Sequence, residues 1–465
     1  MARAEHDRDL DLSVPRTVHI VGLGGSIMSA FAAVLTRMGH RVSGSDLRDS
    51  RTLERLRALG VDARVGHEAG NVPAGVDAVI ASTAVAPSNP EVQRAHDLGV
   101  PVFSRAATQR AIVALRRTVA VAGSHGKTTT SSMLALILRE AGWRPSFLIG
   151  GDLNEVGTNA SWDDGDWLVV EADESDGTFL EFAPEAAIVT NIEADHLTHW
   201  GDFPALVAGF ERFLDDTPGT RVVSADDVVA ARLAGERRND VVTFGFADDA
   251  DYQIRDYVGK RNGSEFVLAR RGEAGDVVEM PVPGRHNAKN AAAAAAMALE
   301  IGVPFDAVRA ALGGFGGVAR RFQFRGERDG VTFVDDYAHL PGEVAHMIDA
   351  AREGDWAHVI VVFQPHRYTR TAALWRDFAD AFTGADTVVL TDIYGFNETP
   401  QPGVSGRLIL RAVLDAHPEQ PVLYLPRRDD LVRHVPKLAR SGDVVLTLGA
   451  GDLTTVPDEW LALEV

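Results

Sequence analysis

The hydrophobic residues of this chain fall into short apolar runs, each followed by a glycine-rich or acidic turn and then by a helical pattern. The first unit, residues 16–46, reads RTVHIVGLGGSIMSAFAAVLTRMGHRVSGSD, which predicts a strand, a tight turn, a helix and a second strand. Further apolar runs occupy residues 76–83 and 100–105. Strands that alternate with helices in this way predict a parallel sheet.

The same pattern restarts twice along the chain. Residues 117–143, RTVAVAGSHGKTTTSSMLALILREAGW, predict a strand and a helix that stops at Gly142. Short alternating runs over 219–283 favour antiparallel strands, and PGRHNAKNAAAAAAMALEIG predicts a helix that stops at Gly302. Strand and helix alternate again from residue 319. We therefore expect an α/β protein of three domains, at residues 1–113, 114–318 and 319–465.

The amino-acid composition agrees with an α/β globular protein and argues against membrane and nucleic-acid partners. A chain of 465 residues is too long for one core, and 45% apolar with 24% charged residues is typical of soluble globular proteins. No apolar run reaches the roughly 18 residues of a membrane span, and the opening MARAEHDRDLDLS lacks the apolar part of a secretory signal. With 0 Cys as well, we expect a cytoplasmic protein without membrane insertion. The net charge of −20 argues against a nucleic-acid partner.

Residues 120–132, AVAGSHGKTTTSS, look like a phosphate-binding loop that lacks one glycine. A Walker A loop has Gly, four further residues, and then Gly-Lys-Ser/Thr, and Val121 takes the place of that first Gly. A glycine turn after a buried strand still aims N–H groups and a helix N-terminus at a phosphate. Lys127 would then contact the β- and γ-phosphates, and Thr128 would offer its hydroxyl to Mg²⁺. The alternative, a turn with a solvated lysine, is disfavoured by the order strand, loop, Gly-Lys-Thr, helix.

Acidic residues follow two predicted strands of the central segment. In VVEADESD, Glu171 directly ends an apolar run, and in TNIEADH, His196 follows a second run. Because ligands bind at the carboxyl ends of parallel strands, Glu171 is expected beside the phosphate loop as a ligand of Mg²⁺. His196 is a weaker candidate, since Mg²⁺ prefers carboxylate to imidazole. A solvated acidic loop is the alternative.

A third glycine loop, GLGGSIMS, partly fits the dinucleotide-binding fingerprint Gly-x-Gly-x-x-Gly. Gly22 and Gly24 match, whereas the last position is Ile27. Asp46 ends the second predicted strand, where an acid can accept from a ribose hydroxyl. The loop predicts a nucleotide, but not NAD specifically.

Two motifs of the third segment place polar residues after apolar strands. In FQPHRYTRT, Arg367 and Arg370 lie three residues apart, so on a helical turn they share a face and can clamp a carboxylate or phosphate. In DDYAH, Asp336 and His339 follow an apolar strand. Ordinary surface charge is the alternative for both motifs.

In this order, the motifs resemble those of the Mur ligases of peptidoglycan synthesis over nearly the whole chain. They are HIVGLGG, SGSD, GSHGKTTT, VVEADESD, TNIEADH, VPGRHNAKN, GVARRFQ, DDYAHLP, FQPHRYTRT and LTLGAGD. The resemblance implies an N-terminal Rossmann-like domain for a UDP-sugar, a central P-loop ATPase-type domain with a parallel sheet, and a C-terminal Rossmann-like domain. It also implies an ATP- and Mg²⁺-dependent ligase, with UDP-N-acetylmuramate and L-alanine as substrates and an acyl phosphate as intermediate.

The resemblance also assigns residues to each part of the site. The implied ATP-binding residues are Gly123, Ser124, His125, Gly126, Lys127, Thr128, Thr129, His286, Asn290, Arg320, Arg321 and Asp336. The implied metal ligands are Thr128, Glu171 and His196. The implied substrate-binding residues are Gly22, Gly24, Gly25, Ser26, Asp46 and His366. The implied catalytic residues are Lys127, His339, Arg367 and Arg370.

Two positions depart from the family pattern. Ile27 replaces the last glycine of the first loop, where a branched side chain is expected to crowd the strand or the pyrophosphate, and Leu340 stands where related enzymes read AHHP. These departures leave open a related ligase with another amino acid or a peptide as acceptor, in peptidoglycan recycling or secondary metabolism. A non-catalytic nucleotide-binding regulator is a further alternative, although it would need few of these residues. A dehydrogenase is disfavoured by Ile27.

Overall fold

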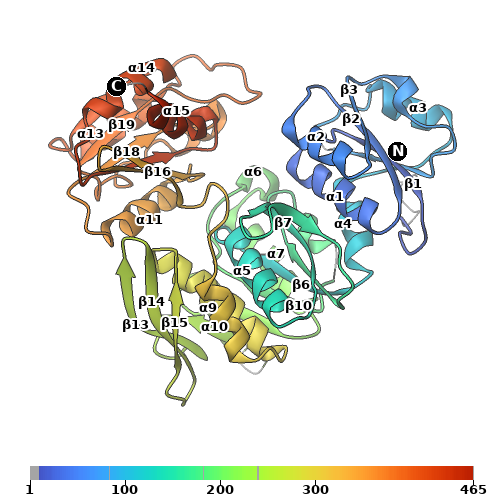
Figure 1. Cartoon of the computed structure of the whole chain (residues 1–465), viewed down its shortest axis with the longest axis horizontal. Helices are drawn as coiled ribbons and strands as arrows, with labels where there is room; N and C mark the ends of the chain where they lie inside the picture. Colours follow the sequence, from blue (N-terminus) through green and yellow to red (C-terminus); the bar gives the residue numbers. More distant parts are fainter. Residues whose placement is uncertain (1–9, 83, 182, 238–239, 464–465) are drawn as a thin grey trace. The chain divides into compact units, whose positions relative to one another are not determined.

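The computed structural model describes residues 10–463 except 83, 182, 238 and 239, and it contains three β-sheets flanked by helices (Figure 1). Each sheet is the centre of one domain, which confirms the predicted three-domain α/β fold. The chain forms two compact units, Met1–Gln253 with Ala269–Glu273 and Asn290–Leu312, and Ile254–Leu268 with Ala274–Lys289 and Gly313–Val465. The domain limits at 113/114 and 318/319 stay a prediction.

The N-terminal sheet is fully parallel, in the order β3-β2-β1-β4-β5. This order is that of a Rossmann half. Its strands are β1 (Thr17–Val21), β2 (Arg41–Asp46), β3 (Asp62–Val65), β4 (Ala78–Ala81) and β5 (Val102–Phe103). Its helices are α1 (Ser26–Arg37), α2 (Arg51–Ala58), α3 (Pro90–Asp97) and α4 (Arg105–Val113). In Figure 1, α1 and α2 cover one face of the sheet and α3 the other.

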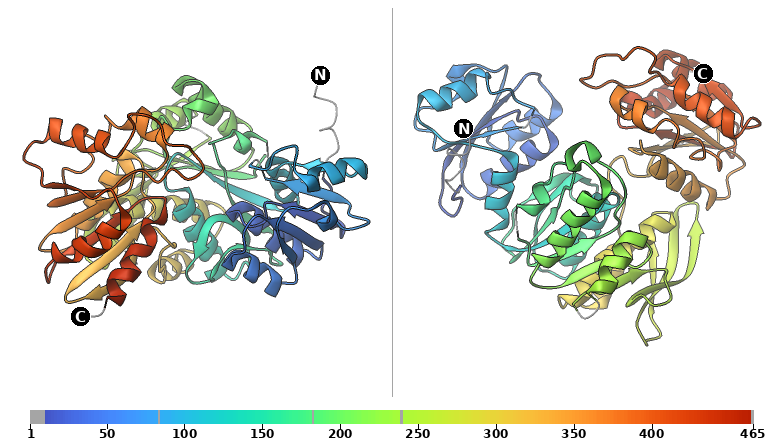
Figure 2. Two further views of the ribbon diagram at one scale, coloured as in Figure 1. Left: turned by 90° about the horizontal axis from the view of Figure 1, so that it is seen from above. Right: turned by 180° about the vertical axis from the view of Figure 1, so that it is seen from behind.

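The central sheet has ten strands in the order β15-β14-β13-β12-β11-β10-β6-β9-β7-β8. Its strands are β6 (Arg117–Ala122), β7 (Ser146–Leu153), β8 (Thr158–Ser161), β9 (Trp167–Glu171), β10 (Ala186–Val189), β11 (Arg221–Ser224), β12 (Val242–Gly245), β13 (Tyr252–Lys260), β14 (Gly263–Arg270) and β15 (Asp276–Met280). Its helices are α5 (Lys127–Glu140), α6 (Leu197–Trp200), α7 (Phe203–Asp215), α8 (Val228–Glu236), α9 (Arg285–Glu300) and α10 (Phe305–Gly313). Figure 2 shows α7 and α8, in green, on the face turned away from the viewer of Figure 1.

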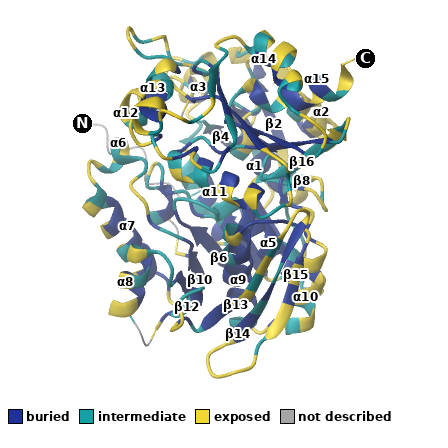
Figure 3. Cartoon of the chain, turned by 90° about the vertical axis from the view of Figure 1, so that its left-hand side faces the viewer, coloured by how far each residue is buried: buried dark blue, intermediate teal, exposed yellow. Residues whose placement is uncertain are grey.

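The pattern over 219–283 was only partly predicted. β14 and β15 pair antiparallel, as expected, but β11 and β12 continue the parallel sheet beside β10, so the antiparallel prediction is wrong for them. Both predicted helix stops are confirmed, because Gly142 (φ 76°) and Gly302 (φ 101°) follow their helices in a left-handed conformation. The strands of this sheet carry its core, and Figure 3 shows β6 and β10 as buried.

The C-terminal sheet runs β16-β17-β21-β18-β19-β20, with β16 antiparallel to β17 and the rest parallel. Its strands are β16 (Gln323–Arg328), β17 (Val331–Asp336), β18 (Val359–Phe363), β19 (Thr387–Leu390), β20 (Val422–Tyr424) and β21 (Val444–Leu448). Its helices are α11 (Pro341–Arg352), α12 (Tyr368–Leu374), α13 (Arg407–Ala416), α14 (Arg428–His434) and α15 (Val456–Ala462). Leu448 pairs with both Asp336 and Phe363. The motifs DDYAH, FQPHRYTRT and LTLGAGD therefore lie together at the carboxyl ends of three neighbouring strands.

No helix in the described part of the chain is both long and apolar enough to cross a membrane.

The N-terminal domain contains a fully buried carboxylate, that of Glu91 in α3, which is 0% exposed. It accepts from the Ser45 hydroxyl (2.5 Å), the Asn71 amide (2.7 Å) and the Glu68 N–H (3.1 Å), and lies 3.3 Å from His19 Nε2. These contacts join α3 to β1, β2 and the loop after β3, so the charge is satisfied from every side.

We expect Glu91 to make the N-terminal domain sensitive to acid. Burial would raise the pKa of Glu91, but hydrogen bonds from His19, Ser45 and Asn71 lower it to about 2. Because this pKa is depressed from 4.5, the stabilisation, about 3 kcal/mol, is present above pH 4.5 and lost as the pH falls towards 2. Amide hydrogen exchange of β1 and β2 at neutral pH and near pH 3 measures the loss.

Glu91→Gln should lower the stability of β1 and β2 at neutral pH and show a smaller further loss in acid than the wild type. Glu68→Gln is the matched control, because the exposed Glu68 contributes only its backbone N–H to the network. The same acid sensitivity in wild type and Glu91→Gln would contradict the assignment.

Candidate active site

The phosphate loop connects β6 to α5 and requires glycine at both ends. Gly123 (φ 135°) and Gly126 (φ 84°) have left-handed conformations. A Cβ at Gly123 would lie 2.1 Å from Thr190 Oγ1, and one at Gly126 would lie 2.4 Å from Asn290 Oδ1. Val121, where a Walker A loop has glycine, is a fully buried residue of β6, so the loop is shorter because the strand is longer. The start of α5 leaves N–H groups without helical partners, which suits an anion.

The end of β10 holds this loop in shape. Asn191 accepts from the His125 N–H (2.8 Å) and donates to the His125 carbonyl (3.0 Å). Thr190 donates to the same carbonyl at 2.6 Å, and the Ser124 N–H donates to the Asn191 carbonyl at 3.1 Å. Ser124 and His125 thus use their backbone groups to attach the loop to its neighbour strand. Anion-binding N–H groups are left to the first turn of α5, from Gly126 onward.

Lys127 is held by an ion pair that the sequence did not reveal. Its Nζ donates to both oxygens of Glu174 (2.8 and 3.0 Å) and to the Gly123 carbonyl (2.6 Å). The Glu174 side chain is only 1% exposed. Burial would lower the pKa of Lys127, but the carboxylates of Glu174 and Asp173 raise it, so the ammonium stays charged.

The predicted metal ligands lie around the same loop. Glu171 ends β9 opposite Val121 of β6, and its Oε1 accepts from the Gly150 N–H at 2.6 Å. His196 precedes α6, and its Nε2 lies 3.2 Å from Asp195 and 4.0 Å from Glu174. Within the described residues no group of three or more His, Asp and Glu side chains could hold a metal ion. A metal here would therefore depend on hydroxyl, water and phosphate oxygens as well, as Mg²⁺ commonly does.

The two residues predicted for the adenine side have different surroundings. Asn290 of α9 lies against the phosphate loop, since its Oδ1 faces Gly126 and accepts from Thr130 Oγ1 at 3.3 Å. His286, at the start of α9, stacks on His346 of α11 with ring centroids 6.4 Å apart. Burial and the nearby His346 lower the pKa of His286 to about 3, so it is a neutral imidazole at physiological pH.

In the N-terminal domain, the glycine loop uses its own N–H groups internally. Those of Gly22 and Leu23 donate to the Ser45 carbonyl (both 2.9 Å), and that of Gly24 donates to Asp46 Oδ2 (2.8 Å). A Cβ on Gly24 would lie 2.9 Å from Asp46 Oδ2, which explains this glycine. N–H groups for a pyrophosphate therefore begin at Ser26, the first residue of α1.

Two N-terminal positions differ from what their sequence motif suggested. Asp46 was expected at a ribose, yet one of its oxygens already holds the glycine loop, so its ribose role stays a prediction. Ile27 lies in the first turn of α1, partly buried against the hydrophobic core. A helical residue needs no glycine conformation, so the branched side chain adds packing there and leaves the loop intact.

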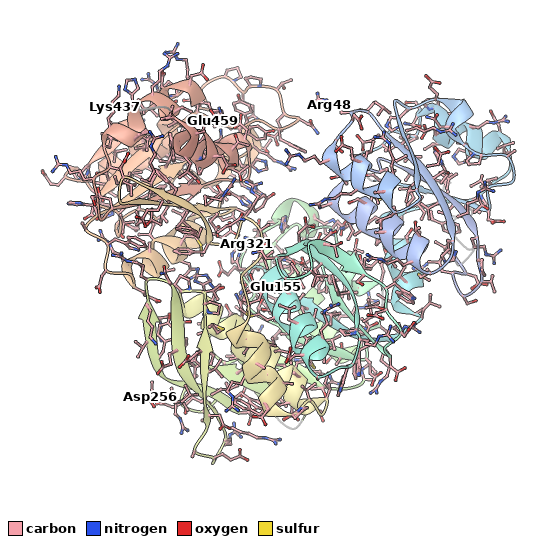
Figure 4. All side chains as sticks on the ribbon, in the orientation of Figure 1. Arg48, Glu155, Asp256, Arg321, Lys437 and Glu459 are labelled. Carbon is pink, nitrogen blue, oxygen red and sulfur yellow. The ribbon has the colours of Figure 1, made fainter. Side chains whose placement is uncertain are left out.

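In the C-terminal domain, two arginines meet one tyrosine. The guanidinium groups of Arg320 and Arg321 lie 4.8 and 5.4 Å from the Tyr337 ring centroid, a cation–π distance. Arg320 also donates to the Gly449 carbonyl at 2.8 Å. In Figure 4, Arg321 and Lys437 are labelled on opposite sides of the C-terminal domain. The motifs VARRFQ, DDYAH and LGAGD thus come together.

The Asp336 carboxylate connects two of these motifs, GVARRFQ and DDYAH, through hydrogen bonds. Its two oxygens accept from the Phe322 and Ala338 N–H groups, both at 2.7 Å. Burial raises the pKa of Asp336 to about 6, although the charge of Arg321 opposes the shift. The side chain holds the loop that carries the arginines, and its predicted contact with a nucleotide stays a prediction.

The histidines predicted for the reaction end lie side by side. His339 and His366 have ring centroids 5.7 Å apart. His339 Nδ1 is 3.0 Å from the Tyr337 carbonyl, so Nδ1 carries the proton and Nε2 can accept one. His366 Nδ1 accepts from Arg370 at 3.2 Å. Burial lowers the pKa of His339, and burial with the nearby His339 lowers that of His366 to about 4, so both are neutral near pH 7.

Arg367 and Arg370 do not share a helical face, because Arg367 precedes α12 and only Arg370 lies within it; that the two clamp one ligand stays a prediction. Arg367 caps α12 with φ 69° and lies over Phe396, 5.4 Å from the ring centroid, whereas Arg370 lies on His366. Leu340 is buried, and its N–H and that of His339 both donate to Glu343 (3.1 and 2.9 Å). The helix start is therefore fixed by Glu343.

Sequence reasoning missed three residues of the site, Glu174, Thr190 and Asn191. All three lie within the quoted motifs VVEADESD and TNIEADH. Attention to strand ends found the motifs, but only the folded loop shows which member turns towards Lys127 or His125. The available signal was a second acid, Glu174, three residues after the predicted metal ligand Glu171.

A glycine loop with a buried lysine, next to acidic strand ends, defines a P-loop type nucleotide-binding protein. The chain matches three family descriptions: "Mur ligase family, catalytic domain" over residues 17–117, "Mur ligase middle domain" over 121–298, and "Mur ligase, glutamate ligase domain" over 320–451. It is 43% identical to the UDP-N-acetylmuramate–L-alanine ligase of Bradyrhizobium sp. (strain ORS 278), with 96% of this chain and 98% of that protein covered. The chain belongs to the Mur ligase family.

Solved structures agree with this assignment. The UDP-N-acetylmuramate–alanine ligase MurC from Thermotoga maritima superposes with a TM-score of 0.82 at 29% identity, covering 96% of this chain and 98% of that one. The murein peptide ligase Mpl from Psychrobacter arcticus superposes with a TM-score of 0.70 at 24% identity, covering 97% and 100%. At that identity the second likeness shows the shared fold alone.

Asn191→Ala should weaken the binding of ATP, the ligand predicted for the loop. The substitution removes two hydrogen bonds to His125, and we expect about a tenfold higher Kd in a protein that still unfolds cooperatively in a thermal melt. Isothermal titration calorimetry measures the affinity. Asn262→Ala, in the exposed turn between β13 and β14, is the control. An unchanged Kd in Asn191→Ala would show that the loop keeps its shape without this contact.

Proposed function

We propose that this protein uses ATP to join L-alanine to the lactyl carboxylate of UDP-N-acetylmuramate, and that it does so in the cytoplasm. The observation that carries the proposal is the glycine loop with Lys127 in a chain that matches a named relative over 98% of that relative's length. The absence of Cys supports the cytoplasmic location.

The residues around the loop fit ATP with Mg²⁺. A triphosphate would meet the N–H groups at the start of α5, the Lys127 ammonium and the Thr128 hydroxyl. Thr128, Glu171 and His196 are the proposed protein ligands of the metal. ATP would supply the phosphoryl group that converts the carboxylate to an acyl phosphate, from which phosphate leaves when the amine attacks and the amide forms.

We assign the remaining roles to the C-terminal domain. Arg320, Arg321 and Asp336 are proposed to serve the nucleotide, and Arg367, Arg370 and His366 the amino acid. The unprotonated Nε2 of His339 can take a proton from the attacking amine, because burial keeps that imidazole neutral. Arg370 lies on His366, and a guanidinium held this way can pair with the carboxylate of the amino acid.

In the N-terminal domain, we propose that the UDP-sugar pyrophosphate binds at the start of α1. Gly22, Gly24 and Gly25 shape the loop there, and Ser26 begins the helix. Asp46 is proposed to act chiefly by holding Gly24, since one oxygen accepts from the Gly24 N–H (2.8 Å) and the other from the Arg48 N–H (3.4 Å).

A related ligase with another amino acid or a peptide as acceptor is the second candidate. Leu340, in place of a histidine at the reaction end, is the observation that favours it. The nearby structure named as a murein peptide ligase shares the fold.

The ligase reaction should require every substrate. We expect ADP to form only when ATP, Mg²⁺, UDP-N-acetylmuramate and L-alanine are all present, and Lys127→Ala to abolish it, because the γ-phosphate loses its cation. A coupled ADP assay, with mass spectrometry of the amide product, measures both. ADP formation that is independent of the sugar nucleotide and the amino acid would refute the proposal.

A panel of acceptors distinguishes the two candidate functions. L-Alanine should have the highest kcat/KM among L-alanine, glycine, L-serine and a tripeptide that begins with L-alanine. The assay is the same, with each acceptor varied at saturating UDP-N-acetylmuramate. Faster turnover of glycine, L-serine or the peptide would replace L-alanine as the substrate while leaving the ligase chemistry in place.

A further inference from the structure

Protein oxygens satisfy every hydrogen-bond donor of the Lys127 ammonium. Its hydrogen bonds go to Glu174 Oε2 (2.8 Å), Glu174 Oε1 (3.0 Å), the Gly123 carbonyl (2.6 Å) and the Ser124 carbonyl (3.3 Å). An ammonium has three protons, so four oxygens satisfy it completely. The two-oxygen contact of the Glu174 carboxylate is the contact that two oxygens of a phosphate would make.

The Glu174 carboxylate cannot reach water when Lys127 turns to another anion. Its side chain is 1% exposed, and Asp173 precedes it in the same acidic loop. A second basic group, His196, has its Nε2 4.0 Å from Glu174 Oε1. A buried carboxylate that loses its cation is strongly unfavourable unless another positive charge replaces the first.

We propose that Glu174 is a positioning residue. Its carboxylate holds the Lys127 ammonium until a triphosphate with its metal ion replaces the carboxylate as the partner of Lys127. A triphosphate without a metal would take the lysine and leave Glu174 as an uncompensated buried anion close to new negative charge. A divalent cation that arrives with the triphosphate supplies the missing positive charge. The ion pair therefore selects the metal complex of the nucleotide over free ATP or pyrophosphate. This inference rests on the proposed function only in requiring that the loop binds a triphosphate.

The loop that carries Glu174 is anchored independently of its carboxylate. Trp200 Nε1 donates to the Glu174 backbone carbonyl at 2.9 Å, and the Gly177 N–H donates to the same carbonyl at 3.2 Å. Glu174→Gln keeps the side chain's shape and its acceptor oxygen, so it changes the charge with the fold retained. A thermal melt checks this.

The test compares Kd values for ATP and for pyrophosphate, each in EDTA and in excess Mg²⁺, by isothermal titration calorimetry. Glu174→Gln should bind both metal-free anions at least tenfold more tightly than the wild type. Its Kd for Mg-ATP should change by less than threefold, so the preference for the metal complex shrinks. Glu174→Asp keeps the charge on a shorter side chain. Its Kd values for the metal-free anions should fall between those of the wild type and of Glu174→Gln.

Two controls separate competition for Lys127 from a general loss of negative charge. Glu193→Gln makes the same charge change in the neighbouring TNIEADH loop, where Glu193 lies 3.4 Å from His125, and should change the metal-free Kd by less than twofold. In a Lys127→Ala background, Glu174→Gln should give a much smaller gain than in the wild type.

Three results would overturn the proposal. These are unchanged or weaker metal-free binding in Glu174→Gln, an equal gain in Glu193→Gln, and an undiminished gain in the Lys127→Ala background. A wild-type protein that binds no ATP, with or without Mg²⁺, would instead overturn the proposed function itself.

Discussion

The contact between the phosphate loop and the end of β10 is the constraint on which the site depends. Gly123 approaches Thr190 so closely that no side chain fits, and Asn191 holds both backbone groups of His125. This attachment fixes where α5 begins, and therefore where its free N–H groups and Lys127 lie. The short form of the loop follows from it, because β6 extends through Val121 and only four residues remain to reach the helix.

Several cations in the predicted motifs each have a specific partner within their own unit, in a protein whose net charge is −20. Lys127 has Glu174, Arg320 and Arg321 lie over Tyr337, and Arg370 lies on His366. Buried or half-buried cations need such partners, since desolvation would otherwise outweigh any benefit. A strongly acidic chain can therefore still hold anionic ligands, because local geometry and not net charge decides the field at the loop.

The sequence predicted the strands, the helix stops and the edges where polar motifs gather, because apolar runs and glycines act through local rules. It failed for β11 and β12, whose pairing depends on the distant strand β10. It also failed to find Glu174 and to place Asn290 beside Gly126, which lies 164 residues earlier in the chain. Contacts between distant segments follow from tertiary packing, and neither periodicity nor motif spacing encodes them in a single sequence.

The surroundings of Ile27 and Leu340, the two departures from the family pattern, show what each one changes. Ile27 is a helical residue packed on the core, so it changes neither the conformation of the glycine loop nor its N–H groups. Leu340 leaves His339 in place, because Glu343 binds the N–H groups of both residues and the Tyr337 carbonyl fixes the ring. What Leu340 does remove is one polar side chain close to His339. The groups proposed to make the acyl phosphate are those around Lys127, which belong to the other compact unit, so an effect of Leu340 on the preferred acceptor is the proposal that the acceptor panel tests.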